Sequence, residues 1–328
     1  SWGSLRGILH PMNEIKATRQ LGKRINRQLV LNAIKTGPRS RAGIAQVTGL
    51  SPATVSNLTF ELIDEGFVHE TGVVETSRGR PPVLLRINSA ARYVVGVKVM
   101  PRSLVAVVTD LDASVVASRT LDDFGAAAEA TRPSPGAVVE GLVAVVQEIV
   151  SDAGVGESDL LGVGVGLAGI VDSLAGVCRY SPFFGWRDAD LVRPLRARLG
   201  LEVHLANDVD SLTIAEQWFG HGQGCDHFVV VTVGRGIGAG FVFNGQFYGG
   251  HAGGVGELAH VPVAPDGPIC VCGKRGCLEV MASDVALARA AAEAIAGGAP
   301  TTLRAGDEFT LEAIVDAATK GDDLARDL

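Results

Sequence analysis

The sequence predicts an α/β protein in which a small helical module precedes a larger body of two similar lobes. Hydrophobic residues make up 47% of the 328 residues, aromatic residues only 5%, and 42 residues are glycine. This composition is typical of sheets and helices packed through Val, Ala, Leu and Gly. Residues 1–92 carry 13 Lys and Arg against 6 Asp and Glu, whereas the remainder carries 16 against 30. A basic front on an acidic body favours a nucleic-acid-binding module joined to a second function.

The basic module is expected at residues 24–88, behind an N-terminal extension, residues 1–23, that we expect to be flexible. Its first helix is predicted at Arg24–Lys35, because apolar residues recur on one side, namely Ile25, Leu29 and Ile34. Gly37-Pro38 then ends this helix.

A helix-turn-helix is predicted next. Ser40 caps a short helix, and Gly49 allows the tight turn after it. Ser51 then caps a third helix whose first turn holds Pro52, while Ala45 lets the two helices approach closely. Three apolar residues of the third helix face inward: Val55, Leu58 and Leu62.

The outward face of the third helix carries short polar side chains that suit a DNA major groove: Ser51, Thr54, Ser56, Asn57 and Thr59. Wing strands are expected at 67–70 and 83–86, and Arg78 and Arg80 lie between them on a stiff segment that suits a minor groove. We therefore predict a winged helix-turn-helix that binds double-stranded operator DNA. The alternative, a three-helix protein-interaction module, is disfavoured by the polar face and the two arginines.

The body, residues 89–328, is predicted to form lobes at about 89–205 and 206–328. In the first lobe we expect strands at 93–99, 104–110 and 114–120, a helix at 136–153, a strand at 160–167, a helix at 189–199 and a strand at 202–206. The second lobe opens with strands at 227–233 and 238–243 and continues with helices after Met281. Two β-rich openings followed by α/β crossovers predict a pair of similar lobes. No apolar run approaches the roughly 20 residues that span a bilayer.

A cysteine-rich loop is the most specific motif of the chain. Residues 270–279 read CVCGKRGCLE, where Gly273 and Gly276 let the backbone wrap tightly. Four side chains suit tetrahedral Zn2+, and with four protein ligands the metal would be structural: His260, Cys270, Cys272 and Cys277. The alternatives are reduced core or loop cysteines, and a disulfide, which five cysteines in the whole chain disfavour.

This loop fits C-x-C-G-x-x-G-C-x-E and resembles the signature of the ROK family (repressors, open reading frames and kinases). The resemblance extends from about Arg24 to the C-terminus, and it is strongest to the family's sugar-responsive repressors. It implies an actin-like sugar-kinase fold for the body, with ligands in the cleft between the lobes. In that family a His and three Cys hold zinc next to a sugar pocket.

The phosphate loops of the family's kinases are altered in this chain. The kinases have D-x-G-G-T between the first two strands, where this chain has Lys98-Val99-Met100-Pro101-Arg102, counted back from Asp110. Their second loop, G-T-G-I-G-G-G, reads GRGIGAG at residues 234–240. We therefore expect no ATP-dependent phosphoryl transfer. The new cations could bind another anion or form salt bridges.

By resemblance, five polar residues would converge on a sugar: Asn207, Asp208, Glu257, His260 and Glu279. Asp208 occupies the position of the kinases' general base, and His260 would bind zinc through one ring nitrogen and face the ligand with the other. Phe183 stands where the kinases have a sugar-binding Asn, and the segment 166–172 lacks their turn-setting Pro. This exchange either favours a ligand with an acetamido methyl or deoxy position or means that sugar binding has been lost.

The prediction is a cytoplasmic transcriptional regulator of carbohydrate genes, a repressor without catalytic residues, that uses one structural zinc. Its partners would be operator DNA, a sugar or sugar-phosphate effector and further copies of the chain in a homodimer or homotetramer, with no membrane. Effector binding would alter lobe closure and the spacing of two DNA heads. The alternatives are an ATP-dependent sugar kinase with an accessory DNA-binding domain, since Asp208 is kept, and a DNA-bound scaffold. Residues 322–328 fall within an expected helix, so we expect a truncated chain.

Overall fold

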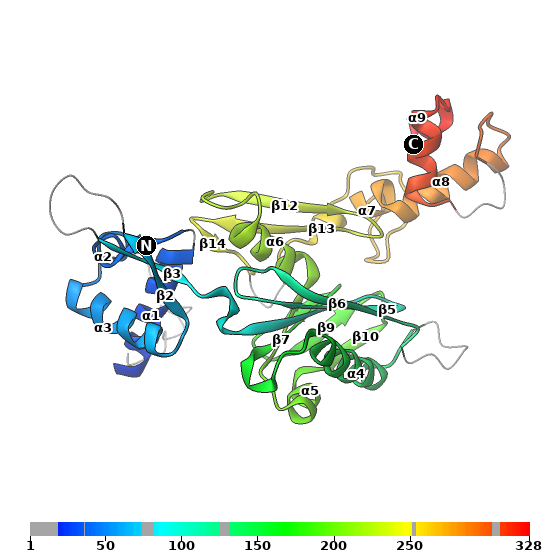
Figure 1. Ribbon diagram of the computed structural model, residues 1–328. Coiled ribbons are helices and arrows are strands. Elements are labelled where there is room, and N and C mark those ends of the chain that lie inside the picture. The colour runs from blue at the N-terminus through cyan, green and yellow to red at the C-terminus, as the bar shows by residue number, and fades with distance from the viewer. Residues whose placement is uncertain (1–18, 36, 74–81, 125–131, 251–253, 304–308) are drawn as a thin grey trace, which may run out of the picture. The chain divides into compact units, whose positions relative to one another are not determined.

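The computed structural model describes residues 19–35, 37–73, 82–124, 132–250, 254–303 and 309–328. The chain divides into two compact units, Ser1–Arg92 and Tyr93–Leu328 (Figure 1). Among the described residues, no helix combines the length and the apolar character that crossing a membrane requires.

The N-terminal unit holds three helices and a small sheet with the strand order β1-β3-β2. Its elements are α1 (Arg19–Lys35), β1 (Arg39–Ser40), α2 (Arg41–Thr48), α3 (Pro52–Asp64), β2 (Val68–Val73), β3 (Val83–Ile87) and η1 (Ser89–Ala91). Both predicted N-caps are confirmed, because the Ser40 and Ser51 hydroxyls accept hydrogen bonds from backbone N–H groups of the first helical turn. Gly49 ends α2 at a φ of 69°, which glycine adopts without strain. The predicted wing strands are the antiparallel pair β2 and β3.

The buried side of α1 differs from the predicted one. Val30 and Ile34 are buried, whereas Ile25 and Leu29 are 51% and 38% exposed. Nearer the N-terminal end of α1, on the same side as Val30 and Ile34, two ion pairs connect this helix to α3 and to its C-cap: Lys23–Glu61 and Arg27–Glu65. Positions 23, 27, 30 and 34 form one helical row, and positions 25 and 29 lie about 200° around the helix from 23 and 27. Two of the three predicted core positions of α1 were therefore wrong.

A five-stranded sheet with the order β11-β7-β4-β5-β6 opens the C-terminal unit. Its strands are β4 (Tyr93–Val99), β5 (Ser103–Thr109), β6 (Val115–Asp122), β7 (Leu160–Leu167) and β11 (Val203–Asn207). The first three pair antiparallel, and β7 and β11 add in parallel. Helix α4 (Pro135–Ala153) packs on β5 and β6, and α5 (Val192–Leu199) packs on α4 and β11, so both cover one face of the sheet (Figure 1). The 3-10 turn η2 (Glu157–Asp159) precedes β7. This is the predicted element order.

A second sheet lies where the sequence predicts no strands. It consists of β8 (Ile170–Asp172), β9 (Val177–Ser181) and β10 (Trp186–Asp190). The helix predicted at 189–199 is correspondingly shorter, because residues 189–190 belong to β10 and α5 begins at Val192. Strands of three to five residues are too short to show a periodic pattern in sequence.

The rest of the unit begins with α6 (Asp208–Phe219) and an antiparallel sheet of β12 (Phe228–Val233), β13 (Ile237–Phe243) and β14 (Gln246–Phe247). There follow η3 (Glu257–His260), α7 (Leu278–Ala282), α8 (Asp284–Ala296), α9 (Leu311–Thr319) and α10 (Asp323–Asp327). Helix α6 packs directly on β13 at Gly240, where a Cβ atom would lie 2.0 Å from the Thr213 hydroxyl oxygen. The last three helices share a small apolar core of Ala291, Ile314, Ala317 and Ala325.

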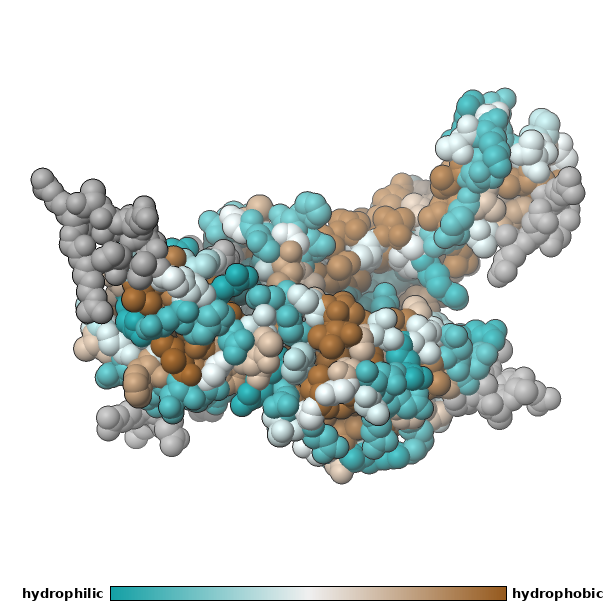
Figure 2. Space-filling model, in the orientation of Figure 1, coloured by the Kyte–Doolittle hydropathy of each residue, from teal (hydrophilic) through white to brown (hydrophobic). Residues whose placement is uncertain are grey.

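One side of β12 is apolar and exposed. Alternate residues of this strand, Val229, Val231 and Val233, are each about half exposed or more. Figure 2 shows hydrophobic surface gathered toward the α7 end of the β12–β13 sheet. The period-2 alternation of a strand therefore gives β12 an apolar side at the surface.

Candidate functional site

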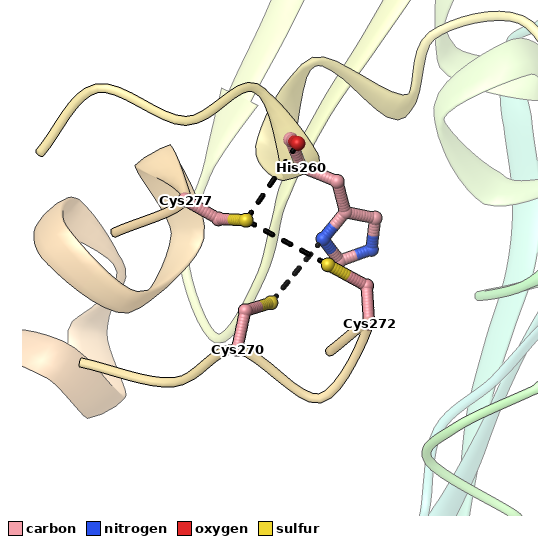
Figure 3. A group of neighbouring side chains, drawn as sticks. All are labelled: His260, Cys270, Cys272 and Cys277. Carbon is pink, nitrogen blue, oxygen red and sulfur yellow. Dashed lines mark hydrogen bonds between the residues drawn. The ribbon is translucent and has the colours of Figure 1, made fainter. Parts of the chain in front are cut away.

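Four metal-binding side chains converge in the segment between β14 and α7 (Figure 3). Their ligand atoms all lie within 4.8 Å of one another: those of His260, Cys270, Cys272 and Cys277. Nδ1 of His260 is 3.5 Å from Sγ of Cys270, and Sγ of Cys272 is 3.6 Å from Sγ of Cys277. Ligands of a tetrahedral zinc ion, about 2.1–2.3 Å from the metal, lie about 3.6 Å apart. The four predicted ligands therefore form a cluster that can hold a metal ion.

Glycines shape this loop as predicted. Gly273 and Gly276 have φ values of 88° and 57°. A Cβ atom at Gly276 would lie 1.6 Å from the carbonyl oxygen of Ala264, so a larger residue cannot occupy this position without moving the backbone. The close approach brings Cys277 back toward Cys270 and Cys272.

The thiols of the cluster favour a bound cation. All five cysteines of the chain are free thiols. Burial raises the pKa of the Cys277 thiol to about 11, whereas a hydrogen bond from the backbone N–H of Lys274 lowers the pKa of Cys272. Adjacent thiolates repel one another, so several can ionise together only when a cation neutralises them. The loop thus has both the donor atoms and the electrostatic demand of a metal site.

The N-terminus of α6 holds Asn207 and Asp208. Oδ1 of Asn207 accepts hydrogen bonds from the backbone N–H groups of Val209 and Asp210 at 2.7 and 3.1 Å, and its Nδ2 donates to the carbonyl oxygen of Gly169 at 2.9 Å. Asn207 is therefore the N-cap of α6, engaged through both ends of its amide. Asp208 lies in the first turn, where the helix dipole favours a negative charge.

Asp210 adds a carboxyl group that the sequence analysis missed. Burial and the negative charges of Asp208 and Glu257 raise the pKa of Asp210 to about 6. This effect shows that three carboxyl groups, two from α6 and one from η3, lie close enough to repel one another. The Asp-Val-Asp spacing was the available signal, but its meaning depends on Glu257, which is distant in sequence.

Glu257 lies between the acidic side chains of α6 and the His260–Cys270–Cys272–Cys277 cluster. Its Oε2 lies 3.5 Å from Nε2 of His260, while Nδ1 of the same ring faces Cys270. A metal ion on Nδ1 leaves the proton on Nε2, which can donate to the carboxylate. In this structure the second ring nitrogen therefore meets Glu257. Gly256 fixes the start of η3, since a Cβ atom there would lie 1.9 Å from the carbonyl oxygen of Ala239.

Glu279 lies beside the glycine-rich turn between β12 and β13. Its Oε2 is 3.1 Å, and Cζ of Phe183 is 3.6 Å, from the point where a Cβ atom of Gly236 would stand. The structure thus brings together Glu279, Phe183 and the turn. It places Asn207, Asp208, Glu257 and His260 in a second group around the start of α6 and η3.

The two segments that the sequence analysis compared with the kinases' phosphate loops carry an ion pair and a neighbouring carboxyl group. Arg102 binds Oδ1 of Asp123 through Nε and Nη2, at 3.2 and 2.8 Å. Asp284, which the sequence analysis did not single out, lies beside the glycine-rich turn and donates its backbone N–H to the carbonyl oxygen of Gly234. Oδ1 of Asp284 is buried without a hydrogen-bond partner among the described residues.

Three of the predicted DNA-binding residues are exposed on α3 and at its N-cap. Ser51, Ser56 and Asn57 are exposed. Thr54 is half-buried, and its hydroxyl lies 2.9 Å from the Ser51 hydroxyl, so it supports the helix cap. Arg78 and Arg80 of the predicted wing lie outside the described residues.

Two residues of α3 change the predicted face. Thr59 is fully buried, because it continues the inward row of Val55 and Leu58, and its Oγ1 accepts a hydrogen bond from Nε of Arg41 at 3.1 Å. Its predicted outward position was wrong. Phe60 was missed and is 71% exposed, although its spacing of three and four residues from Asn57 and Ser56 marks the same face.

Comparison with known proteins identifies the family. Residues 95–328 match the ROK family. The chain belongs to the ROK family. It is 32% identical over 266 residues to the xylose repressor of Bacillus subtilis, across 81% of this chain and 67% of that protein. The chain spans about two thirds, 65–67%, of the length of the first curated relatives it matches.

Two solved ROK structures differ in how much of the chain they cover. A ROK family transcriptional regulator, a homologue of the Escherichia coli MLC protein, has a TM-score of 0.81 and 31% identity over 93% of this chain and 76% of its own. A ROK family glucokinase from Streptomyces griseus, in complex with glucose and AMPPNP, has a TM-score of 0.57 and 29% identity over 72% of this chain and 73% of its own. The match of the regulator is too long to lie within the C-terminal unit alone, so it includes much of the N-terminal unit. The ROK regulator therefore shares a larger part of the architecture than the ROK kinase does.

Proposed function

We propose that this protein is a sugar-responsive transcriptional regulator, a repressor, that binds operator DNA through the N-terminal unit and a sugar through the ROK unit. The observation that carries the proposal is a helix-turn-helix, capped at both helices, in one chain with a ROK domain. The sequence differences from the kinases' phosphate loops agree with it. The similarity to a xylose repressor and to a ROK transcriptional regulator supports it.

Helix α3 is the proposed recognition helix. Its exposed side offers Ser51, Ser56 and Asn57 for polar contacts with base edges and phosphates, and Phe60 for an apolar contact, while Thr54 supports the cap. Arg78 and Arg80 remain proposed minor-groove contacts of the wing.

DNA binding is tested by fluorescence anisotropy with fragments of the chain's own promoter region. We expect salt-sensitive, sequence-selective binding that Asn57→Ala weakens about tenfold or more. Gln28→Ala, an exposed amide on α1, is the matched control and should bind normally. Equal binding to all fragments, independent of Asn57, would remove the proposed DNA function.

The effector site is proposed at the start of α6 and η3. Asp208, Glu257 and Glu279 offer carboxylate acceptors for sugar hydroxyls, Asn207 holds the helix terminus, and His260 joins the site to the metal cluster. Phe183 beside Glu279 supports an apolar patch on the sugar. Binding of the sugar would lower operator affinity, and this coupling is measured as a shift of the anisotropy titration.

A structural Zn2+ is the proposed occupant of the His260–Cys270–Cys272–Cys277 cluster. The donor set of one nitrogen and three sulfurs and the tetrahedral spacings support zinc over the harder cations, which prefer oxygen ligands. The metal would supply stability to the loop and would fix the ring of His260. Its test is metal analysis of the purified protein.

Phosphoryl transfer is the second candidate, because Asp208 occupies the position of a kinase general base and the fold is shared with a ROK glucokinase. Three observations weigh against it: Lys98 forms an ion pair with Asp208, Arg102 binds Asp123, and the Asp284 carboxyl group, with one oxygen buried, lies beside the glycine-rich turn. A coupled ADP-release assay across common hexoses decides. Turnover that disappears in Asp208→Asn would establish the kinase.

We further propose a homodimer or homotetramer, since two DNA heads suit two operator half-sites about one helical turn or a multiple of it apart. Light scattering of the purified protein, free and bound to operator DNA, measures the number of copies. A monomer on one half-site would contradict this part of the proposal.

A further inference from the structure

Lys98 lies next to the acidic side chains at the start of α6. Within the part of the chain that the structure describes, it is the only lysine or arginine in an ion pair with Asp208, Asp210 or Glu257. Its Nζ lies 3.6 Å from Oδ2 of Asp208, and its side chain keeps 57% of its exposure. Lys98 is the first residue of the segment that replaces the kinases' first phosphate loop, and it takes no part in the proposed zinc site.

The register of the sheet holds Lys98 in this place. Lys98 on β4 lies opposite Gly166 on β7, and the start of α6 lies over that glycine. A Cβ atom at Gly166 would be 3.7 Å from Cα of Asp208 and from Oγ of Ser211. The start of α6 therefore lies in ordinary packing distance of this part of the sheet, and the neighbouring lysine reaches Asp208. The ion pair is therefore a consequence of strand pairing and of helix packing.

The charges around this pair do not balance. Lys98 is paired with Asp208 alone, whereas three carboxyl groups, those of Asp208, Asp210 and Glu257, are neighbours here. The pKa of Asp210 is raised to about 6 by burial and then by the charges of the other two, which indicates excess negative charge here even with Lys98 in place. On the other side, Glu257 has the neighbouring imidazole of His260 as its partner.

We propose that this site takes an uncharged sugar, with Lys98 as the counter-ion of Asp208 and a free hydroxyl of the sugar facing the carboxylates. This inference rests on the proposed function and names the class of its effector. Carboxylates accept hydrogen bonds from hydroxyl groups, whereas a phosphate dianion has no proton to donate and is repelled by them.

The alternative interpretation is that Lys98 binds a phosphate group of the effector. It requires Lys98 to leave Asp208, and the phosphate then lies among three carboxyl groups with one compensating ammonium. The pair with Lys98 is partly exposed and stabilises Asp208 only modestly, so the main cost of this arrangement is repulsion of the phosphate by the carboxyl groups. The observed pairing therefore favours the uncharged ligand.

Calorimetry with matched pairs of sugars tests the proposal on the full-length, metal-loaded protein. The probes are xylose, glucose and N-acetylglucosamine, with glucose 6-phosphate and N-acetylglucosamine 6-phosphate as the charged partners. We expect at least one uncharged sugar to bind, and its phosphate to bind at least tenfold more weakly at low salt. The difference should narrow as salt rises, because salt screens the repulsion.

Two variants and a control separate the roles of Lys98. In Asp208→Asn, Lys98 loses its partner, so the ratio of the affinity for the free sugar to that for its phosphate should fall severalfold. In Lys98→Met this ratio should increase. Arg102→Met removes a nearby cation that is bound to Asp123, and should leave the preference unchanged. Circular dichroism and metal content confirm that each variant is folded.

Two results would overturn the inference, and they differ in what they leave standing. A phosphate that binds more tightly than its free sugar, and loses this advantage in Lys98→Met, overturns the uncharged class but keeps a sugar-sensing regulator. No binding by any of the five probes overturns sugar sensing and the inference together, while the DNA-binding test stands independently.

Discussion

Replacement of Asp210 by Asn should stabilise the protein without effector at neutral pH. The pKa of this carboxyl rises from 3.8 to about 6 through burial and through repulsion by Asp208 and Glu257. A rise of this size corresponds to about 3 kcal/mol against the ionised form. Because Asp210 is only half-buried, water screens part of the effect, and about 1–2 kcal/mol remains. Loss of a favourable charge in the first turn of α6 offsets about 0.3–1 kcal/mol. We expect a net gain of about 1 kcal/mol, or about 2–4 °C in melting temperature.

The pH dependence provides the sharper test. Below pH 3.8 Asp210 is protonated in the folded and unfolded states, so the variant has no advantage from this charge. Above about pH 6 the carboxyl is ionised in both states, and the full cost is present in the parent protein. The stability of the parent relative to Asp210→Asn should therefore fall as pH rises from about 4 to 6.

Thermal unfolding of parent and variant, each measured at pH 4, 5, 6 and 7.5 in the same buffer, follows this difference. Comparison at equal pH removes the effect of protonating the metal ligands. Asp327→Asn, at an exposed site near the end of α10, controls for the change in net charge. A variant that is less stable at pH 7.5, or a difference that does not change with pH, would refute the reasoning.

Three further predictions address the cluster, the recognition helix and the C-terminal helices. Cys272→Ser should lower both zinc content and melting temperature, because metal binding is linked to folding, whereas Cys225→Ser outside the cluster should lower neither; full zinc with an unchanged melting temperature would show the ligand assignment to be wrong. Phe60→Ala should weaken operator binding severalfold by anisotropy with unchanged stability, since the ring is 71% exposed; unchanged affinity would remove it from the DNA contact. Asp322→Asn should destabilise α10, because the carboxylate accepts hydrogen bonds from Thr301, Thr302 and the backbone N–H of Ala325, which hold its pKa low. This stabilisation is present above about pH 4 and is lost as pH falls, so urea titrations of parent and variant should converge in acid.

The helix-turn-helix could be predicted because its determinants are local. Ser40, Gly49 and Ser51 act within one helical turn of their positions, and the structure confirms each. The inward face of α1 was wrong because it depends on α3, where Glu61 and Glu65 bind the helix from a distance in sequence. Short-range patterns therefore specified the helices, whereas the packing of one helix on another decided which rows are buried.

In the candidate site, too, local features were predictable and long-range contacts were not. The cluster of His260 with the three cysteines was predictable because their spacing, together with glycines at φ values that favour glycine, encodes a tight loop. Asp210 was not, because its significance arises only when η3 brings Glu257 beside α6. Phe60 was missed because an exposed aromatic residue breaks no local rule; only its measured exposure separates it from the core.

In the proposed function, His260 would link the stability of the metal loop to recognition of the sugar. Its Nδ1 faces the thiols and its Nε2 faces Glu257, so a metal on the first nitrogen determines that the second carries a proton. With that proton His260 would donate a hydrogen bond to Glu257, which would offset part of the repulsion that Glu257 exerts on Asp210. Metal and sugar would then favour the same orientation of one carboxylate. Since coupling between two binding sites is reciprocal, whatever the metal adds to sugar affinity the sugar adds to metal affinity. Repulsion among these carboxyl groups lowers the stability of the protein without effector. This is consistent with a site whose full stability requires both ligands.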